Sequence, residues 1–162
     1  MGTKFSTRVW VSVVGIASIF FGSKGYADTV ISVADFGLKP DTRENAVAYV
    51  QKAIEACRGK EPVTLVFPEG RYDFWPQYAH EKNYYETNTY DVFPKRLAML
   101  FEGLHNITVD GNGSQFVMHD RIQPITVENC DGVTLKNFSI DWDIPLTAQA
   151  RVTKVGSDFF EI

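Results

Sequence analysis

The sequence predicts an all-β fold, a right-handed parallel β-helix (a solenoid) whose N-terminal end is covered by an amphipathic helix. Three observations support this prediction: segments 98–111 and 124–137 match each other, their strands are short, and Asn or Gly stands between the strands. A fixed repeat with a period in the twenties is typical of a stacked solenoid. It is too short for paired-helix repeats, and leucine-rich repeats would show a denser leucine pattern. An antiparallel sandwich of short strands is the alternative interpretation.

Residues 1–27 have the layout of a secretory signal peptide. Lys4 and Arg8 supply a positive start, the run 9–22 is mostly apolar, and small residues precede Asp28. The run is short for a membrane span and no stop-transfer pattern follows it, although a retained N-terminal anchor is the alternative. We therefore expect an exported protein, periplasmic or secreted, with no stable membrane span after signal cleavage.

The composition argues against nucleic acid and metal partners. A net charge of −4 offers no clustered excess of Lys and Arg for phosphate binding. The three histidines show no metal-ligand spacing, so we expect neither a metal nor a cofactor. Cys57 falls on a helical face and Cys130 on a strand-like one, and we interpret both as small buried thiols, with a disulfide as the alternative.

The first elements are a strand over 29–33 and a helix over 41–57. Asp41, with Glu44 three positions later, fits a capping box at the start of that helix. Four apolar side chains recur at helical spacing: Val47, Val50, Ile54 and Cys57. Gly59 is expected to end the helix. A solenoid needs a cover at its terminal coil, and this helix is expected to supply it.

The segment 63–74 predicts a strand, a turn at Pro68-Glu69-Gly70 and a second short strand. Over 76–96 the pattern dissolves into polar residues mixed with aromatic ones. A loop of that length is usually functional or disordered. Its aromatic content argues against disorder.

The repeat appears when residues 124–137 are placed over residues 98–111. Five apolar positions coincide: Ile125, Val127, Cys130, Val133 and Leu135 fall on Met99, Phe101, Leu104, Ile107 and Val109. In a stacked coil, side chains one lap apart lie on top of each other. The offset therefore predicts that Met99 lies beside Ile125 and that Ile107 lies beside Val133. The expected corner residues are Asn106, Gly111, Asn129, Gly132 and Asn137.

The last residues, 146–162, leave the repeat and alternate like a hairpin around Gly156-Ser157-Asp158. We expect them to begin an inserted β-barrel or other β-subdomain, after a β-helix portion over 28–145. The chain stops in a strand-like pattern after few coils. We therefore expect an N-terminal portion of a longer protein.

Two parts of the chain resemble known enzymes. SVADFGLKPDTRENAVAYVQKAI, followed by LVFPEGRYDF, resembles the opening of polysaccharide-active β-helix enzymes, including polygalacturonases. Residues 94–145, above all NFSIDWD with Pro145, resemble glycoside hydrolase family 110, the exo-acting α-1,3-galactosidases that remove terminal galactose from blood-group-B-type and related glycans. The resemblance covers nearly all residues after the signal segment.

The resemblance implies metal-free hydrolysis of a galactose-terminated oligosaccharide or glycoconjugate. It implies inversion, in which one carboxylic acid protonates the leaving oxygen and another carboxylate activates water. The acid and base are expected beyond Ile162, so we expect this stretch alone to be inactive. The alternatives are a pectin-active hydrolase or lyase on the same scaffold, and a non-catalytic β-helical adhesin or carbohydrate-binding protein.

Five residues are candidate substrate contacts: Asp141, Trp142, Asp143, Tyr84 and Tyr85. In an extended segment Asp141 and Asp143 point to the same side, roughly 6.5 Å apart. Either they line the sugar cleft, or Asp143 caps the turn before Pro145 while Trp142 packs inward. The tyrosines of the long loop either pack against the apolar C–H face of galactose or anchor the loop to the coils.

Overall fold

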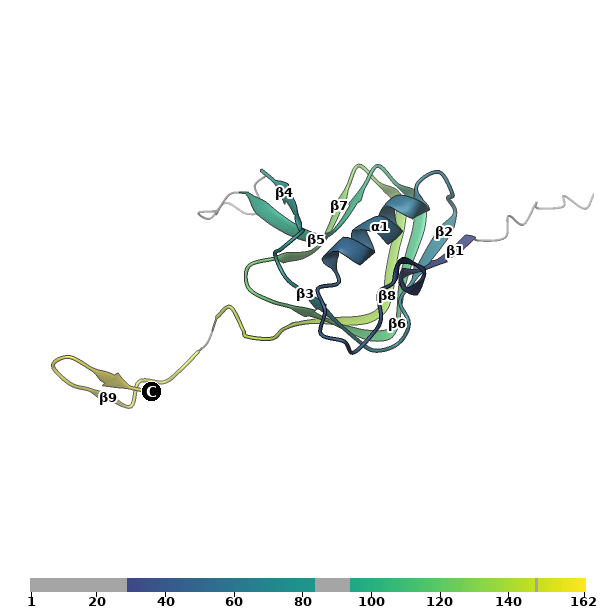
Figure 1. Cartoon of the computed structure of the whole chain (residues 1–162). Helices are drawn as coiled ribbons and strands as arrows, with labels where there is room; N and C mark the ends of the chain where they lie inside the picture. Colours follow the sequence, from purple (N-terminus) through teal and green to yellow (C-terminus); the bar gives the residue numbers. More distant parts are fainter. Residues whose placement is uncertain (1–28, 84–93, 148) are drawn as a thin grey trace, which may run out of the picture.

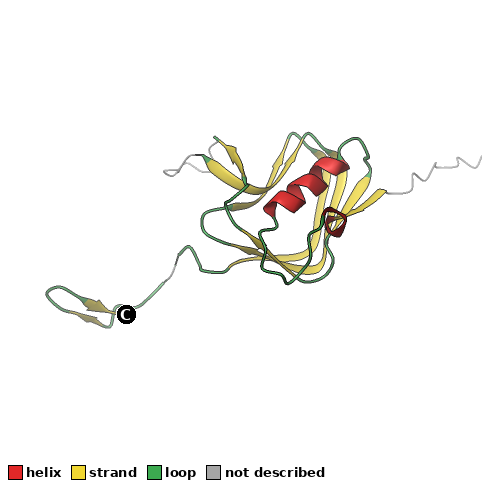
Figure 2. Ribbon diagram, viewed as in Figure 1, coloured by secondary structure: helices red, strands yellow, loops and turns green. Residues whose placement is uncertain are grey.

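The computed structural model describes residues 29–83, 94–147 and 149–162. The predicted signal peptide, Tyr84 and Tyr85 lie outside these ranges. The described residues are mostly β-structure with little helix, as predicted, and the larger sheets contain parallel strands (Figures 1 and 2). None of the helices in the described ranges is long and apolar enough to cross a membrane.

The strands within the described ranges form three sheets (Figure 2). The largest contains β1 (Thr29–Ser32), β2 (Val63–Val66), β3 (Arg71–Phe74), β6 (His105–Met118) and β8 (Asp131–Trp142). The second contains β4 (His80–Lys82), β5 (Lys95–Glu102) and β7 (Gln123–Glu128). The third is the hairpin of β9 (Lys154–Val155) and β10 (Phe160–Glu161). The helical elements of the described residues are the 3₁₀-helix η1 (Val33–Phe36) and the α-helix α1 (Val47–Cys57).

Each pass of the chain from one strand to its parallel neighbour is called a lap here. Parallel pairing joins residues one lap apart, as the sequence repeat predicts. Met99 pairs with Ile125 in β5 and β7, and Ile107 pairs with Val133 in β6 and β8, so this lap has the predicted length. Earlier laps are longer, because Thr29 pairs with Val63 and Val63 pairs with Ile107. Strands from laps of unequal length therefore align in one sheet.

The corner between the two halves of β6 and β8 changes this register. Beyond it Ser114 pairs with Phe138, a shorter separation than that of Ile107 and Val133, because the corner takes more residues in β6 than in β8. Asn137, at the β8 corner, has φ 60°, a left-handed conformation that Asn adopts more readily than most residues. Gly111 is required by close approach, since a Cβ there would lie 2.5 Å from the Cβ of Phe138. The predicted corner residues Asn106, Asn129 and Gly132 also have positive φ.

Helix α1 lies across the space ringed by the strands (Figure 1). Its apolar stripe is the predicted one, with Val47, Val50, Ile54 and Cys57 all buried in the main core. The core continues inward from β2, β3, β5 and β6, where rings such as Phe67, Phe101 and Phe116 are fully buried. Helix α1 thus packs its apolar face on this core, and its outward side chains Lys52 and Glu55 are exposed.

The predicted start of the helix is wrong, because α1 begins at Val47 and its N-cap, Ala46, makes no side-chain cap. Asp41 has φ 61° and pairs with β3 instead: its backbone N–H donates to the Arg71 carbonyl, and its carboxylate accepts from the Arg71 N–H at 2.9 Å. Asn45 then forms a parallel bridge with Asp73. Pairing with the sheet therefore keeps residues 41–46 out of the helix. Gly59, with φ 75°, lies just past the helix end, as expected.

Of two other segments, one differs in detail from expectation and one agrees with it. The loop predicted over 76–96 includes strand β4, which pairs antiparallel with β5. Lys82 of β4 donates to Glu102 and Glu128, which are register partners on β5 and β7. The hydrogen bond with Glu102, followed by the one with Glu128, raises the pKa of Lys82. Both hydrogen bonds fix β4 against β5 and β7. At the other end, the predicted hairpin turn is confirmed, because Gly156 donates to Phe159 between β9 and β10.

Candidate functional site

The candidate site lies where β3, β6 and β8 end. In register, Phe74 pairs with Met118 and Met118 with Trp142, so the next residues along, Trp75, His119 and Asp143, come together from three laps. Backbone bonds extend the alignment by one step, since His119 donates to the Phe74 carbonyl and Asp143 donates to the Met118 carbonyl. The polar side chains that gather there form the cluster described below.

Asp73 is the buried centre of this cluster, with none of its side chain exposed. Arg71 reaches it through two nitrogens, with Nη2 2.6 Å from Oδ1 and Nε 3.0 Å from Oδ2. His119 Nε2 lies 2.8 Å from the same Oδ1. Burial opposes ionisation of the Asp73 carboxyl, but the hydrogen bonds from Arg71 and His119 hold its pKa below its usual range. Asp73 is therefore a carboxylate at neutral pH.

Asp143 belongs to the same network. Its Oδ1 accepts from Arg71 Nη2 at 3.2 Å, and its Oδ2 lies 3.8 Å from His119 Nδ1. Hydrogen bonding to Asp73, and less strongly to Asp143, raises the pKa of Arg71. One guanidinium thus joins a buried carboxylate of an early lap to a partly exposed carboxylate of the last described lap.

An aromatic stack supports His119. Its imidazole ring lies parallel to the Trp75 indole, with 3.9 Å between ring centroids and 7° between planes. With one nitrogen bonded to Asp73 and one face against Trp75, the ring has a fixed orientation. Its other nitrogen, Nδ1, faces Asp143, and only 14% of the side chain remains exposed.

The other two predicted residues of this region, Asp141 and Trp142, point to opposite sides of β8, as neighbours in a strand do. Trp142 packs against the core, as the inward alternative predicts, and its Nε1 is buried with no hydrogen-bond partner among the described residues. Asp141 is exposed and its carboxylate accepts from the Trp142 backbone N–H at 2.8 Å. Asp141 and Asp143 therefore do not share one environment: the first is near solvent and the second is paired with Arg71.

The cluster can orient and bind, but its charges are already paired. Arg71 and the more distant Arg43, 3.8 Å from Asp73, offset the two carboxylates. The buried carboxyl of the cluster, Asp73, is ionised, so it does not offer the neutral form that a general acid needs at neutral pH. No group of His, Cys, Asp and Glu in the described part of the chain is arranged to hold a metal ion. Asp143 is the member of the cluster best able to accept further hydrogen bonds, because its side chain is 43% exposed.

The two cysteines lie apart and both are free. Cys57 is buried, as predicted, and burial raises the pKa of its thiol to about 11. Cys130 was also predicted to be buried but is only half-buried. Its sulfur accepts from the Leu104 N–H and donates to the Phe101 carbonyl. It therefore joins the last lap to the preceding one at the predicted repeat position.

Of the residues in this cluster, the sequence analysis named Asp143 but not Arg71, Asp73 or His119, and Asp141 and Trp142 lie outside the cluster. The missed residues come from laps of unequal length, so no fixed spacing links them. The available signal was the equal position of Trp75, His119 and Asp143 after the last apolar residue of each strand.

No family model matches the chain. Curated relatives do match it. An α-1,3-galactosidase B of Bacteroides thetaiotaomicron is 62% identical over 136 residues, 84% of this chain and 22% of that protein. An α-1,3-galactosidase A of Shewanella woodyi is 40% identical over 77% of this chain and 20% of that protein. An α-1,3-galactosidase B of Phocaeicola vulgatus is 36% identical over 93% of this chain. The chain thus spans about a fifth to a quarter of the length of these relatives.

Proposed function

The chain belongs to the family of the α-1,3-galactosidases, and from this we propose that the protein containing it removes terminal α-1,3-linked galactose from glycans. The observation that carries the proposal is the 62% identity to the Bacteroides thetaiotaomicron protein across most of this chain. The substrate class would be a galactose-terminated oligosaccharide or glycoconjugate. The alignment covers 22% of that relative, so the reacting groups are sought in the remaining length.

The proposed scaffold is a right-handed parallel β-helix. The parallel register across three laps and the left-handed Asn corners support it. The cover that α1 forms over the buried interior supports it as well. Connections between parallel strands are right-handed in almost all folds, and this supports the proposed hand.

The proposed reaction is inverting hydrolysis. A carboxylic acid donates its proton to the glycosidic oxygen as the bond to C1 breaks. A carboxylate removes a proton from water, whose oxygen attacks C1 from the opposite face, so the galactose leaves as the β-anomer. We seek both carboxyls in the length of the protein that this chain does not cover, because the buried Asp73 carboxyl is ionised and already paired with Arg71 and His119.

Asp143 is the residue of this chain that we assign to the substrate side. Arg71 and His119 hold its carboxylate at the end of the last described lap, where it can accept from sugar hydroxyls. Asp143→Asn should raise KM several-fold and change kcat less, because the interaction is with bound substrate and not specifically with the transition state. Asp141→Asn is the matched control, and equal KM values for the two variants would contradict the assignment.

Export is part of the proposal. The basic start, the apolar run and the small residues before Asp28 support a cleaved signal segment. N-terminal sequencing of the protein recovered from the periplasm or medium of its host should begin near Asp28. An intact N-terminus in the membrane fraction would instead support the retained anchor.

The activity test uses the full-length protein and a B-type trisaccharide. We expect release of galactose, seen first as the β-anomer by ¹H NMR, and no cleavage of polygalacturonate. Cleavage of polygalacturonate instead would support the pectin-active alternative. Binding of either glycan by the protein without cleavage would support a carbohydrate-binding protein or adhesin.

A further inference from the structure

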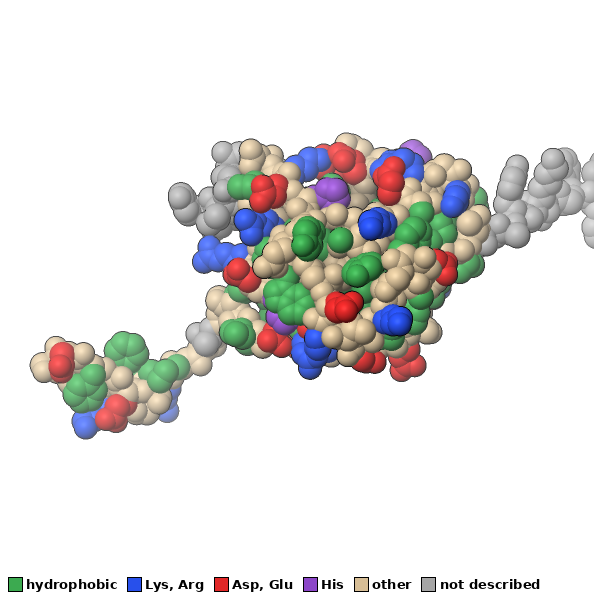
Figure 3. All heavy atoms as spheres, viewed as in Figure 1, with side chains coloured by type: hydrophobic (Ala, Val, Ile, Leu, Met, Phe, Trp, Pro, Cys, Tyr) green, Lys and Arg blue, Asp and Glu red, His purple; other side chains and the backbone are tan. Residues whose placement is uncertain are grey.

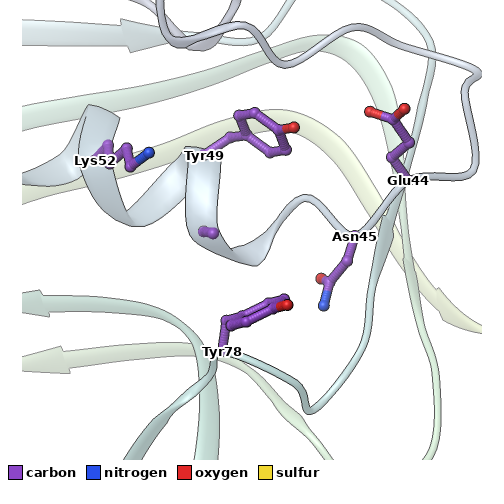
Figure 4. A pocket seen from close by; sticks show the side chains of 6 residues that line it. Glu44, Asn45, Tyr49, Lys52 and Tyr78 are labelled. Carbon is purple, nitrogen blue, oxygen red and sulfur yellow. The ribbon is translucent and has the colours of Figure 1, made fainter.

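A shallow hollow of about 390 Å³ lies between the start of α1 and the segment after β3. It is lined by Glu44, Asn45, Ala48, Tyr49, Lys52 and Tyr78. Figure 4 shows Tyr49 and Lys52 projecting from α1, Tyr78 on the neighbouring segment, and Glu44 and Asn45 on the chain leading into the helix. The hollow thus combines two aromatic side chains with groups that can donate and accept hydrogen bonds.

Tyr78 is held in a conformation that its residue type disfavours. Its φ is 68°, in the left-handed region, where a residue with a bulky side chain is uncommon. Such a conformation costs of order 1–3 kcal/mol and persists only when surrounding contacts impose it. The side chain does not offset this cost by burial, because Tyr78 is 76% exposed.

Two side chains of the helix region impose this conformation. Gln51 Nε2 donates to the Tyr78 carbonyl at 2.9 Å, and Asn45 Nδ2 donates to the Gln77 carbonyl at 2.9 Å. Asn45 Oδ1 accepts from the backbone N–H groups of Val47 and Trp75. Asn45 is therefore a positioning residue that fixes both walls of the hollow, and it has little capacity left for a ligand.

The lining favours a neutral, hydroxyl-rich ligand. Glu44 and Lys52 contribute one negative and one positive charge, so neither a strongly anionic nor a strongly cationic ligand is favoured. Positive and negative side chains are also interspersed on the face of the molecule drawn in Figure 3. An exposed ring packs against the apolar C–H face of a hexose, while carboxylate, ammonium and phenol groups bond its hydroxyls. A shallow surface suits an extended glycan better than an enclosed small molecule.

From these observations we propose that the hollow between Tyr49 and Tyr78 is a binding site for neutral hexose-containing oligosaccharides. Tyr78 supplies the principal ring, held in place by Gln51 and Asn45, and Tyr49, Glu44 and Lys52 complete the contact. The site goes beyond the proposed hydrolysis, because it holds a glycan without cleaving it.

The test is Tyr78→Gly in the full-length protein, with lactose as probe. Glycine adopts positive φ without strain, so this change removes the ring and leaves the backbone at least as stable. Lactose has no α-galactosidic bond and stays intact if the protein is an α-galactosidase. We expect saturation-transfer NMR to show weak binding, on the order of 1 mM in Kd, and a reduction of at least fivefold in Tyr78→Gly. Tyr49→Ala should reduce binding less.

Phe160→Ala is the matched control, because Phe160 is a similarly exposed ring on the β9–β10 hairpin, and its binding should equal that of the wild type. Equal lactose signals in wild type and Tyr78→Gly, no signal in wild type, or a lower Tm for Tyr78→Gly would each overturn the proposal. Tighter binding of digalacturonate than of lactose would overturn the neutral ligand class.

Activity on a B-type trisaccharide, measured on the same samples, separates this inference from the proposed function. Lactose binding without activity would contradict the hydrolase and support the site. Activity with unchanged lactose binding in Tyr78→Gly would contradict the site alone.

Discussion

Strands β6 and β8 have the same register positions but very different burial. Val109 is 1% exposed, whereas its partner Leu135 is 39% exposed. Phe116 is fully buried, and its partner Ile140 is 38% exposed. Strand β6 has β2 and β3 on one side and β8 on the other, whereas the described part of the chain gives β8 a strand neighbour on one side only. In a stack, then, the sequence repeat sets the register, while burial depends on having neighbours on both sides.

The largest expected effect is at Phe116, which contacts the rings of Phe67, Tyr72, Phe74 and Phe138. Phe116→Ala should lower the free energy of unfolding by about 3–5 kcal/mol, because it removes a fully buried ring and leaves a cavity. Ile140→Ala, at the paired position of β8, should cost about 1 kcal/mol, since that side chain is already partly hydrated. Urea unfolding of both variants measures the difference.

Equal losses for Phe116→Ala and Ile140→Ala would mean that β8 is covered in solution, and would remove the contrast between the two strands. Repeating the pair in the full-length protein sharpens it. There, a further lap on β8 should raise the cost of Ile140→Ala.

The second effect is at Asp73, whose register partners lead through Val117 of β6 to Asp141 of β8. Asp73→Asn should cost about 3 kcal/mol at neutral pH, because it leaves Arg71 and His119 without their buried carboxylate. Asp141→Asn, at the exposed position, should change stability by less than about 0.5 kcal/mol. Thermal unfolding at pH 7 measures both.

The pH dependence of the Asp73 effect has a defined sign. Because the pKa of folded Asp73 lies below the unfolded value, its contribution is complete above the unfolded pKa. That contribution is lost as the pH falls through the folded pKa. The gap between wild type and Asp73→Asn should therefore narrow in acid, and a gap that widens in acid would contradict the assigned network.

A smaller effect is expected at the corner of β8. Asn137 has φ 60° and donates from Nδ2 to Asp110 at 3.0 Å. Asn137→Ala should cost about 1–2 kcal/mol from the left-handed backbone, whereas Asn137→Gly should cost clearly less, because glycine accepts that conformation. Denaturant midpoints of the two variants decide the point. Equal midpoints would show that the side-chain hydrogen bond, not the backbone, makes Asn suitable there.

The last prediction concerns reactivity without a change in stability. Cys57 is buried at the C-terminal end of α1 and burial raises its pKa to about 11, whereas Cys130 is half-buried between the last two described laps. Iodoacetamide at pH 8 should alkylate Cys130 well before Cys57, since the thiolate is the reactive form. Peptide mass mapping over time gives both rates, and faster labelling of Cys57 would mean that the helix opens more readily than the last lap.

The contrast also shows what the sequence could predict. The pairs Met99–Ile125 and Ile107–Val133 were predictable, because inward apolar positions must recur when one lap packs on the next. The start of the helix was not predictable, because Asp41 and Glu44 fit a local capping pattern. Only the pairing of Asp41 with Arg71 shows that the helix does not begin there. No fixed spacing revealed the cluster of Asp73, His119 and Asp143, because laps of unequal length bring its members together. The weaker signal was that His119 and Asp143 each follow the last apolar residue of a strand. The assignment of Asp141, Trp142 and Asp143 to substrate contact stays a prediction, as do the placements of Tyr84 and Tyr85, which lie outside the described residues.

The unequal lengths of the successive laps have an evolutionary consequence. Strands pair in register although the segments between them differ in length. Insertions and deletions after Phe74 or Met118 should therefore leave the strand pairing intact. A single-residue deletion within 105–110 would instead turn inward side chains outward. Related proteins can therefore differ in the segments near Tyr78 and Asp143 and still keep the same paired strands.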